Sequence, residues 1–272
     1  MIPRSETARS AAVAAVPFAV YAAGACRTVY VGDSGDLLTA VAVMGIPHPS
    51  GYPLYVLLAR AWSMLMFFLP LPWSASLFSA VCAAAAVAFL YLAARASGVS
   101  PVPAAGAAWL FAFSRSLWGE ANVQRVYALN ALFLAAALLL VLRWLRTDRD
   151  RELVLGALAC GLGASNHLEM AVSGLAIGTF AVVARPALLR RFRLAAACVG
   201  AALIGLLPYL YLPLRARVHP LLEWGDAATP GGFAAVVLRS SFWERRWLTG
   251  PADLWPILED WGRSLLDESA WI

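Results

Sequence analysis

Repeated long apolar stretches constrain this chain more than any other feature of its sequence. They lie at about 10–27, 73–95, 101–114, 126–145, 152–166, 168–184 and 194–214. A helix needs roughly 17 to 25 mostly apolar residues to cross the hydrocarbon core of a bilayer, and most of these stretches approach or reach that length. Charged residues make up only 14% of the 272 residues, against about 25% in soluble domains. The sequence therefore predicts an all-α, polytopic transmembrane helix bundle.

One further apolar run, 53–71, decides the predicted topology. Cytoplasmic loops are enriched in basic residues, and the segments 143–152 and 185–193 are rich in Arg. Suppose that both segments and the N-terminal arginines are cytoplasmic. The number of membrane crossings between them is then consistent only if 53–71 does not cross. Arg60 in the middle of the run would be costly at the bilayer centre, which favours a juxtamembrane helix. The alternative is that 53–71 crosses and the positive-inside rule fails here.

With this topology the polar clusters all fall on the extracytoplasmic side. They are 32–36, 48–53, 118–127, 165–169, 211–220 and 223–226. Polar groups at a membrane are costly and usually mark a functional site, so we expect one cavity at the outer membrane boundary. We divide the chain into a transmembrane domain, 1–214, and an extracytoplasmic amphipathic segment, 215–272. The first includes an outer loop and juxtamembrane segment, 28–72, and the second ends as a piece of a longer protein would.

Composition and missing motifs exclude several classes of function. The formal charge of +5 comes from Arg, since the chain has no Lys. Arginines at helix ends orient a membrane protein, so we expect no nucleic-acid partner. The four cysteines lie in or at the ends of apolar segments without metal-ligand spacing. The absence of GxxxxGK[ST], HExxH, CxxC and GxSxG motifs counts against ATPases, metalloproteases, redox proteins and serine hydrolases.

Asp33 and Asp36 are the candidate catalytic residues. They lie in a Gly-Ser turn that can present a carboxylate to a lipid interface. A partly desolvated carboxylate there could act as a general base, and either could bind a divalent metal, although we assign no metal ligand. The alternative for Asp36 is a structural one, because it precedes LLTAVAVMGI and would cap that helix. No helix start explains Asp33.

The remaining candidates are polar residues that could bind substrate or phosphate. His48 and Tyr52 lie in PHPSGYP, where three prolines and a glycine predict a rigid loop. Each candidate also has a structural alternative, such as an exposed turn, an interfacial aromatic residue, an interhelical hydrogen bond or a helix-end anchor. The full set is His48, Tyr52, Glu120, Arg125, Tyr127, Asn130, Asn166, His167, Arg215, Arg217, Trp224 and Asp226.

Six motifs in a fixed order resemble a known family. They are GDSGD (32–36), GIPHPSGYPLY (45–55), VYALNALF (126–133), NHLEM (166–170), YLPLRA (211–216) and WGD (224–226). Together they resemble the protein O-mannosyltransferase-like multi-pass membrane proteins of the GT-C glycosyltransferase superfamily, whose animal member O-mannosylates receptor ectodomains. The chain departs from the family pattern at Arg125, where the family usually has Glu, and in HPSGYP and EWGDA, where HPPGYP and NWGDP are usual.

The resemblance implies a GT-C bundle with an extracytoplasmic site. Asp33 would be the catalytic base, with Asp36 close by, and the donor a polyprenyl-phosphate sugar whose mannose-like sugar moves to a protein or glycan. The transfer would invert the anomeric centre. Among the cations that would stabilise the departing phosphate, we rank Arg215 first, followed by His48, His167, Arg125 and Arg217. We expect the lipid tail to lie between spans, against 53–71.

Two other functions stay open at this stage. A transporter or flippase could line its path with Asn130, His167 and Arg60. A non-catalytic binder of a lipid-linked substrate is the other alternative, because Arg125 inverts the charge of the family position. The bias toward Arg is typical of a GC-rich genome, so we expect a bacterial inner membrane.

Overall fold

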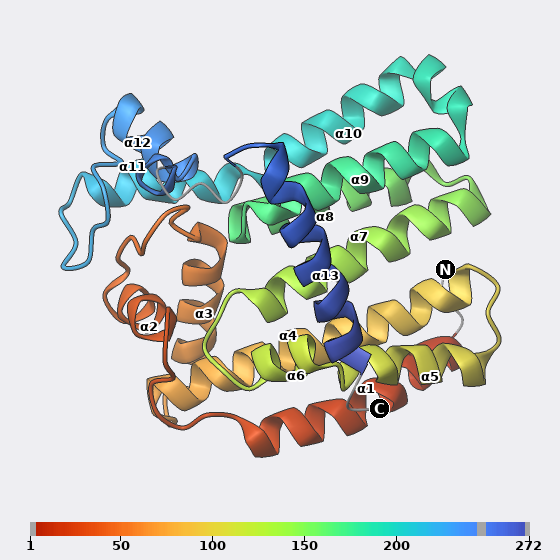
Figure 1. Ribbon diagram of the computed structural model, residues 1–272, viewed down its shortest axis with the longest axis horizontal. Coiled ribbons are helices and arrows are strands. Elements are labelled where there is room, and N and C mark those ends of the chain that lie inside the picture. Colours follow the sequence, from red (N-terminus) through yellow and green to blue (C-terminus); the bar gives the residue numbers. More distant parts are fainter. Residues whose placement is uncertain (1–3, 244–248, 270–272) are drawn as a thin grey trace.

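The computed structural model describes residues 4–243 and 249–269, and every regular element in these two ranges is a helix (Figure 1). The only strand-like pairing described there is an isolated bridge between Ile46 and Glu223. The prediction of an all-α bundle is therefore confirmed.

Seven helices form the body of the molecule and run back and forth along its long axis (Figure 1). They are α1 (Arg4–Gly24), α4 (Leu71–Ala96), α5 (Pro101–Ala112), α7 (Tyr127–Thr147), α8 (Asp150–Asn166), α9 (Glu169–Ala184) and α10 (Phe192–Gly205). Three helical stretches in the described ranges are long and apolar enough to cross a membrane, namely Leu71–Ala96, Tyr127–Thr147 and Phe192–Ala216. The protein is therefore a membrane protein.

The last predicted span, 194–214, is not one continuous α-helix. Helix α10 ends at Gly205, a 3-10 turn follows over Leu207–Leu210, and α11 (Tyr211–Ala216) continues the chain. Pro208 in the turn has no backbone N–H to donate, which interrupts the α-helical bonding. The break matters for the site, because α11 packs beside the loop that carries His48.

The run 53–71 does not cross the bundle. Helix α3 (Pro53–Leu65) has 13 residues, which is about 20 Å and shorter than the hydrocarbon core. Helix α1 ends and α4 begins at the same end of the bundle, with α2 (Ser34–Val43) and α3 between them (Figure 1). The structure therefore agrees with the topology that the Arg-rich loops predicted.

The two ends of the bundle differ in chemistry. The end that carries α2 and α3 also carries α11, α12 (Pro230–Val237) and the short connection between α8 and α9 (Figure 1). The opposite end holds the Arg-rich connections, where Arg185 pairs with Asp148 and Arg191 with Asp150. The predicted gathering of the polar clusters at one end is correct. Which side of the membrane that end faces stays a prediction.

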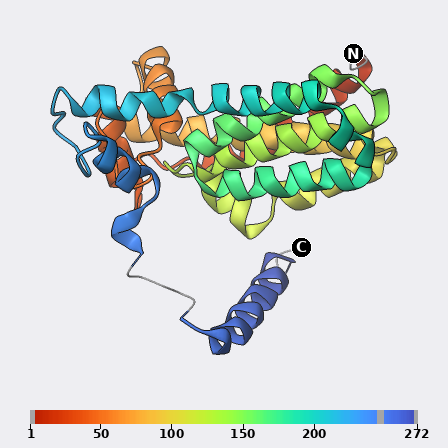
Figure 2. The ribbon, with the colours of Figure 1, turned by 90° about the horizontal axis from the view of Figure 1, so that it is seen from above.

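Part of the predicted amphipathic C-terminal segment can be followed. Residues 244–248, in the middle of the tryptophan-rich stretch, lie outside the described residues. Helix α13 (Leu254–Ser269) carries exposed Trp255, Leu258 and Leu265 at helical spacing. Most of α13 stands away from the bundle (Figure 2), and Glu268 accepts a hydrogen bond from the backbone N–H of Ser116 on α6 (Arg115–Ala121).

Candidate active site

The two aspartates lie at the start of α2, and neither caps it. Gly32 turns the chain with φ +74°, and the helix begins at Ser34 with Asp33 in the N-cap position. The Asp33 side chain makes no capping hydrogen bond. The structural alternative that Asp36 caps the helix is wrong, because the Gly-Ser turn joins the helix and places Asp36 within its first turn. The expectation that no helix start explains Asp33 is also wrong, because the helix begins directly after Asp33. Both carboxylates are thus left for other partners.

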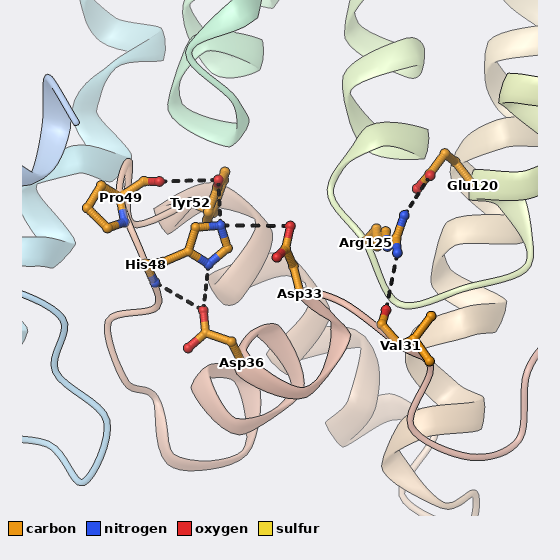
Figure 3. A network of polar contacts seen from close by, with 8 residues as sticks. All are labelled: Val31, Asp33, Asp36, His48, Pro49, Tyr52, Glu120 and Arg125. Carbon is orange, nitrogen blue, oxygen red and sulfur yellow. Dashed lines mark hydrogen bonds and ion pairs between the residues drawn. The ribbon is translucent and has the colours of Figure 1, made fainter. Parts of the chain in front are cut away.

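His48 connects these carboxylates to a phenol (Figure 3). Its Nδ1 lies 2.7 Å from Asp36 Oδ2, and its backbone N–H donates to the same oxygen at 3.0 Å. Its Nε2 lies 2.9 Å from the Tyr52 hydroxyl and 4.0 Å from Asp33 Oδ2. A carboxylate can only accept a hydrogen bond, so Nδ1 carries hydrogen, and Nε2 of the neutral ring is left to accept one from Tyr52.

Aromatic side chains form the wall of this cluster. The His167 ring stacks on Tyr52 with centroids 5.8 Å apart, and Tyr127 approaches the same imidazole at 5.4 Å. Trp224 meets the His48 ring edge-on at 6.3 Å. Burial raises the pKa of Tyr52 and lowers the pKa of His167. The phenol therefore keeps its hydrogen at neutral pH, and His167 favours its uncharged form.

The loop that carries His48 is bonded to the C-terminal segment and packs against α11. Ile46 donates its N–H to Leu222 O at 2.8 Å and accepts one from the N–H of Trp224 at 3.0 Å. Gly51 adopts φ +83°, and a Cβ there would lie 2.9 Å from the Leu212 side chain on α11. The loop is therefore held between α2 and the C-terminal segment, which fixes the imidazole against Asp36.

Arg215 is hydrogen-bonded to the end of α2. Its guanidinium donates to the carbonyls of Val43 and Met44 at the C-terminal end of α2, and Arg60 donates to the carbonyl of Ala42 at 3.3 Å. These carbonyls have no partner within the helix, and a cation there also offsets the helix dipole. The two arginines therefore hold α2 in place, and the guanidinium group of Arg215 is already bonded to backbone carbonyls.

Arg125 makes local contacts as well. It pairs with Glu120 at 3.0 Å, donates to Val31 O at 3.1 Å (Figure 3), and lies over the Tyr30 ring at 5.5 Å. Burial raises the pKa of Glu120, and the charge of Arg125 opposes that shift. Arg125 thereby fixes the segment that leads into Asp33.

The other predicted residues contribute less directly. Asn166 is buried and donates to Val126 O at 3.1 Å, which ties α8 to the start of α7. The Oδ1 atom of Asn130 is buried without a partner among the described residues. Asp226 is exposed and accepts from the N–H of Ala228, and Arg217 is exposed. No described contact brings Asp226 or Arg217 into the His48 cluster.

Two important residues escaped the sequence reasoning. Gln124 is fully buried and joins three segments, since it accepts from Tyr30 N–H at 3.1 Å and donates to Thr28 O and Ser76 Oγ at 3.0 and 2.7 Å. A glutamine at the entry of an apolar span was the available signal. Arg239 follows α12, and its positive charge lowers the pKa of both Tyr52 and His167. No comparable sequence signal marked it.

Arg239 differs from the other arginines near the site. Its guanidinium stacks over the Phe242 ring at 5.3 Å. Within residues 4–243 and 249–269, no hydrogen bond or ion pair engages that guanidinium, whereas Arg125 and Arg215 are both bonded.

An apolar groove of about 940 Å³ opens beside the cluster. Its walls come from α8, α9 and α10, with Phe233 and Val237 of α12 at one end. Leu168, which directly follows His167, and Tyr209 also belong to its wall. The groove therefore runs between these helices, with Leu168 the lining residue next in sequence to His167. Among the described residues, no group of three or more His, Cys, Asp or Glu side chains is arranged to hold a metal ion.

The fold and site together define a helical membrane protein with a carboxylate–imidazole–phenol cluster at one end of its bundle. Residues 33–188 match the family described as "Protein O-mannosyl-transferase TMEM260 N-terminal domain", and the chain belongs to that family. The resemblance seen in the sequence motifs is thereby confirmed.

Two curated relatives carry the same description. The chain is 32% identical over 242 residues to "Protein O-mannosyl-transferase TMEM260" of Mus musculus, an alignment that covers 86% of this chain and 34% of the mouse protein. It is 25% identical over 241 residues to "Protein O-mannosyl-transferase tmem260" of Dictyostelium discoideum, with 82% and 29% covered. The chain thus spans about a third of the length of these relatives. Both relatives come from eukaryotes, so they do not support the prediction of a bacterial inner membrane. No solved structure matches the chain.

Proposed function

We propose that this chain carries the catalytic site of a multi-pass GT-C glycosyltransferase, which moves a mannose-like sugar from a polyprenyl-phosphate donor to a hydroxyl group of an extracytoplasmic protein. The observation that carries the proposal is the position of Asp33. Its side chain is 55% exposed and lies at the head of α2, 4.0 Å from the imidazole of His48. The printed names of the two relatives support the reaction class.

The proposed reaction is a single displacement. Asp33 accepts the proton of the acceptor hydroxyl while the hydroxyl oxygen bonds to the anomeric carbon from the face opposite the phosphate. The bond between the anomeric carbon and the phosphate oxygen breaks, and polyprenyl phosphate leaves as an anion. The anomeric centre is inverted. Because the departing group is already a weak base, it needs a stabilising cation rather than a proton.

The contacts of the arginines favour Arg239 for that stabilising role. Arg215, which the sequence ranked first, is engaged at the end of α2. The charge of Arg239 acts on Tyr52 and His167, and its guanidinium is free of ion pairs with the described residues. Guanidinium groups bind phosphate through several N–H donors. We therefore assign the donor phosphate to Arg239.

The donor tail is assigned to the groove of α8, α9 and α10 rather than to a site against 53–71. An isoprenoid chain is apolar and needs an apolar wall that faces the bilayer, and this groove supplies one. Its end at Leu168 and Phe233 would leave the phosphate near Arg239 and His167. A lipid with an anionic head and an apolar tail fits both features at once.

A transfer assay in lipid tests the proposal. The protein is offered labelled polyprenyl-phosphate sugars, and release of polyprenyl phosphate is measured for the wild type and for Asp33→Asn. We expect Asp33→Asn to lose at least about 100-fold in kcat, the usual contribution of a general base. Asp260→Asn, an exposed site on α13, is the matched control. Arg239→Ala should raise the KM for the donor.

Two results would count against this assignment. Equal turnover by Asp33→Asn would remove Asp33 from the chemistry. If the folded wild type cleaves none of the donors, the chain is not a transferase for this class of lipid, and a transport or binding role becomes the better explanation.

A further inference from the structure

His48 is engaged on both sides of its ring, which an exposed loop histidine does not require. Its side chain is 14% exposed and that of Asp36 is 23% exposed, so the pair is largely shielded from water. The single oxygen Asp36 Oδ2 accepts from both the ring and the backbone N–H of His48. Two bonds to one carboxylate fix the ring orientation and keep hydrogen on Nδ1. Nε2 is thereby aimed at Asp33 and Tyr52.

The Tyr52 hydroxyl allows Nε2 to change its protonation state. When Nε2 is unprotonated, the hydroxyl donates to it across 2.9 Å. When Nε2 carries hydrogen, the hydroxyl can turn and donate to Pro49 O at 3.3 Å, while it accepts from Nε2–H. Both states are satisfied by rotation of one O–H bond (Figure 3). A site with a permanently neutral imidazole would not need the second acceptor.

We propose that His48 receives the proton that Asp33 takes from the acceptor hydroxyl, and that Asp36 is the positioning residue that holds Nε2 of His48 toward Asp33. The proposal rests on the transferase function assigned above. In the step, the O–H bond of protonated Asp33 breaks and an N–H bond forms at Nε2 of His48. Asp33 is restored as a carboxylate, and the imidazolium is paired with Asp36. The 4.0 Å between Nε2 and Asp33 Oδ2 is crossed by a small side-chain rotation or one bridging water.

The surroundings distinguish His48 from the second imidazole of the cluster. His167 stacks on the other side of Tyr52, but its nearest carboxylate, Glu169, is 3.6 Å away and 65% exposed. Burial lowers the pKa of His167, and the charges of Arg239 and His48 lower it further, against Glu169. Tyr127 faces His167 and not His48. The carboxylates that face His48 are those of Asp33 and Asp36, and the other titratable side chains beside it are Tyr52 and His167.

A pH–rate profile tests the relay in the intact protein. Imidazoles ordinarily titrate near pH 6.5, so wild-type kcat for donor cleavage should fall on the acid side of that range. His48→Gln should remove this limb and lower kcat about 100-fold. Asp36→Asn should lower kcat, because the imidazole is no longer held with Nε2 toward Asp33, while the KM for the donor stays unchanged. His219→Gln and Asp260→Asn, both at exposed positions, are the matched controls.

A purely structural role of His48 would lower the rate without removing the limb. An acid limb that persists in His48→Gln, or a kcat that stays unchanged in Asp36→Asn, overturns the relay. If the wild type cleaves no donor, the proposed function fails and the relay fails with it. If the wild type turns over with a limb that His48→Gln leaves in place, only the relay fails.

The pairing of Asp36 with His48 can be measured without turnover. The chain has three histidines, so ¹⁵N labelling of histidine gives three imidazole signals that substitutions at His48, His167 and His219 assign. In the wild type, neutral His48 should carry its hydrogen on Nδ1. Asp36→Asn should move the hydrogen of the neutral His48 ring from Nδ1 toward Nε2 and leave the His219 signals unchanged. A wild-type ring with hydrogen on Nε2, or an unchanged tautomer in Asp36→Asn, contradicts the positioning role.

Discussion

Arginine side chains near the site fall into two groups according to what their guanidinium groups contact. Arg60 and Arg215 donate to the carbonyls at the end of α2, and Arg125 pairs with Glu120. Arg239 is the member of the cluster whose guanidinium is not bonded to another described residue. A sequence shows that an arginine follows a helix, but it does not show which carbonyl groups of another helix the guanidinium binds. Arg215 therefore acts as a helix-end anchor, and our proposal assigns the donor phosphate to Arg239.

His167 leads to a prediction about stability and pH. Burial lowers its pKa in the folded protein, so the unfolded chain binds a proton more readily than the folded one. The stability contributed by neutral His167 is complete above the ordinary imidazole range and is lost as pH falls through the lowered folded value. We expect the melting temperature of the wild type to fall below about pH 6.5 more steeply than that of His167→Gln, in thermal unfolding scans between pH 5 and 8.

The glutamine variant keeps an acceptor for the backbone N–H of Glu169, which His167 Nδ1 binds at 3.3 Å. His219→Gln is the matched control, because that ring is 85% exposed and approaches only Glu223. Parallel melting curves for wild type and His167→Gln would contradict the prediction.

Among the elements, α8 and α10 approach each other most closely at glycines. A Cβ at Gly161 would lie 2.1 Å from the carbonyl oxygen of Ala202, and one at Gly205 would lie 2.5 Å from the backbone N of Leu162. Small residues let helix backbones meet in this way within a membrane. The same contact forms one side of the apolar groove, so it fixes the spacing of the groove walls.

Gly205→Ala should therefore destabilise the bundle, by about 2 to 3 kcal/mol, as overpacking in a tight interface does. Gly200→Ala on the same helix is the matched control, since a Cβ there meets nothing within 4 Å. Because alanine has a higher helix propensity than glycine, Gly200→Ala should leave the free energy of unfolding unchanged or raise it by up to about 1 kcal/mol. Unfolding in detergent with increasing denaturant measures both. Equal effects of the two substitutions would show that the contact does not control packing.

At the scale of the whole molecule, the two ends of the bundle should face opposite sides of the membrane. The basic end carries Arg149 and the other end carries His219, and both are exposed. In a variant whose four native cysteines are replaced, His219→Cys should react with a membrane-impermeant maleimide in intact cells. Arg149→Cys should react only after permeabilisation, because basic loops stay in the cytoplasm. The reverse labelling pattern would show that the site faces the cytoplasm.

The sequence by itself determined the class of fold and the family. Hydropathy sets where helices form in a membrane, and the Arg-rich loops predicted that 53–71 does not cross, as α3 shows. Motif order marked Asp33, Asp36, His48 and Tyr52 as one group, and the structure brings these four together. These features depend on local composition and on counting along the chain, which a sequence displays directly.

Only the tertiary structure decided the partners of the polar groups. The carboxylate of Asp36 binds His48 rather than capping α2, the guanidinium of Arg215 binds α2 from 171 residues away, and Arg239 lies close enough for its charge to act on Tyr52. The groove likewise depends on how α8, α9 and α10 are spaced. A hydrogen bond or ion pair depends on distances of a few ångströms between segments remote in the chain, and those distances arise only when the helices pack.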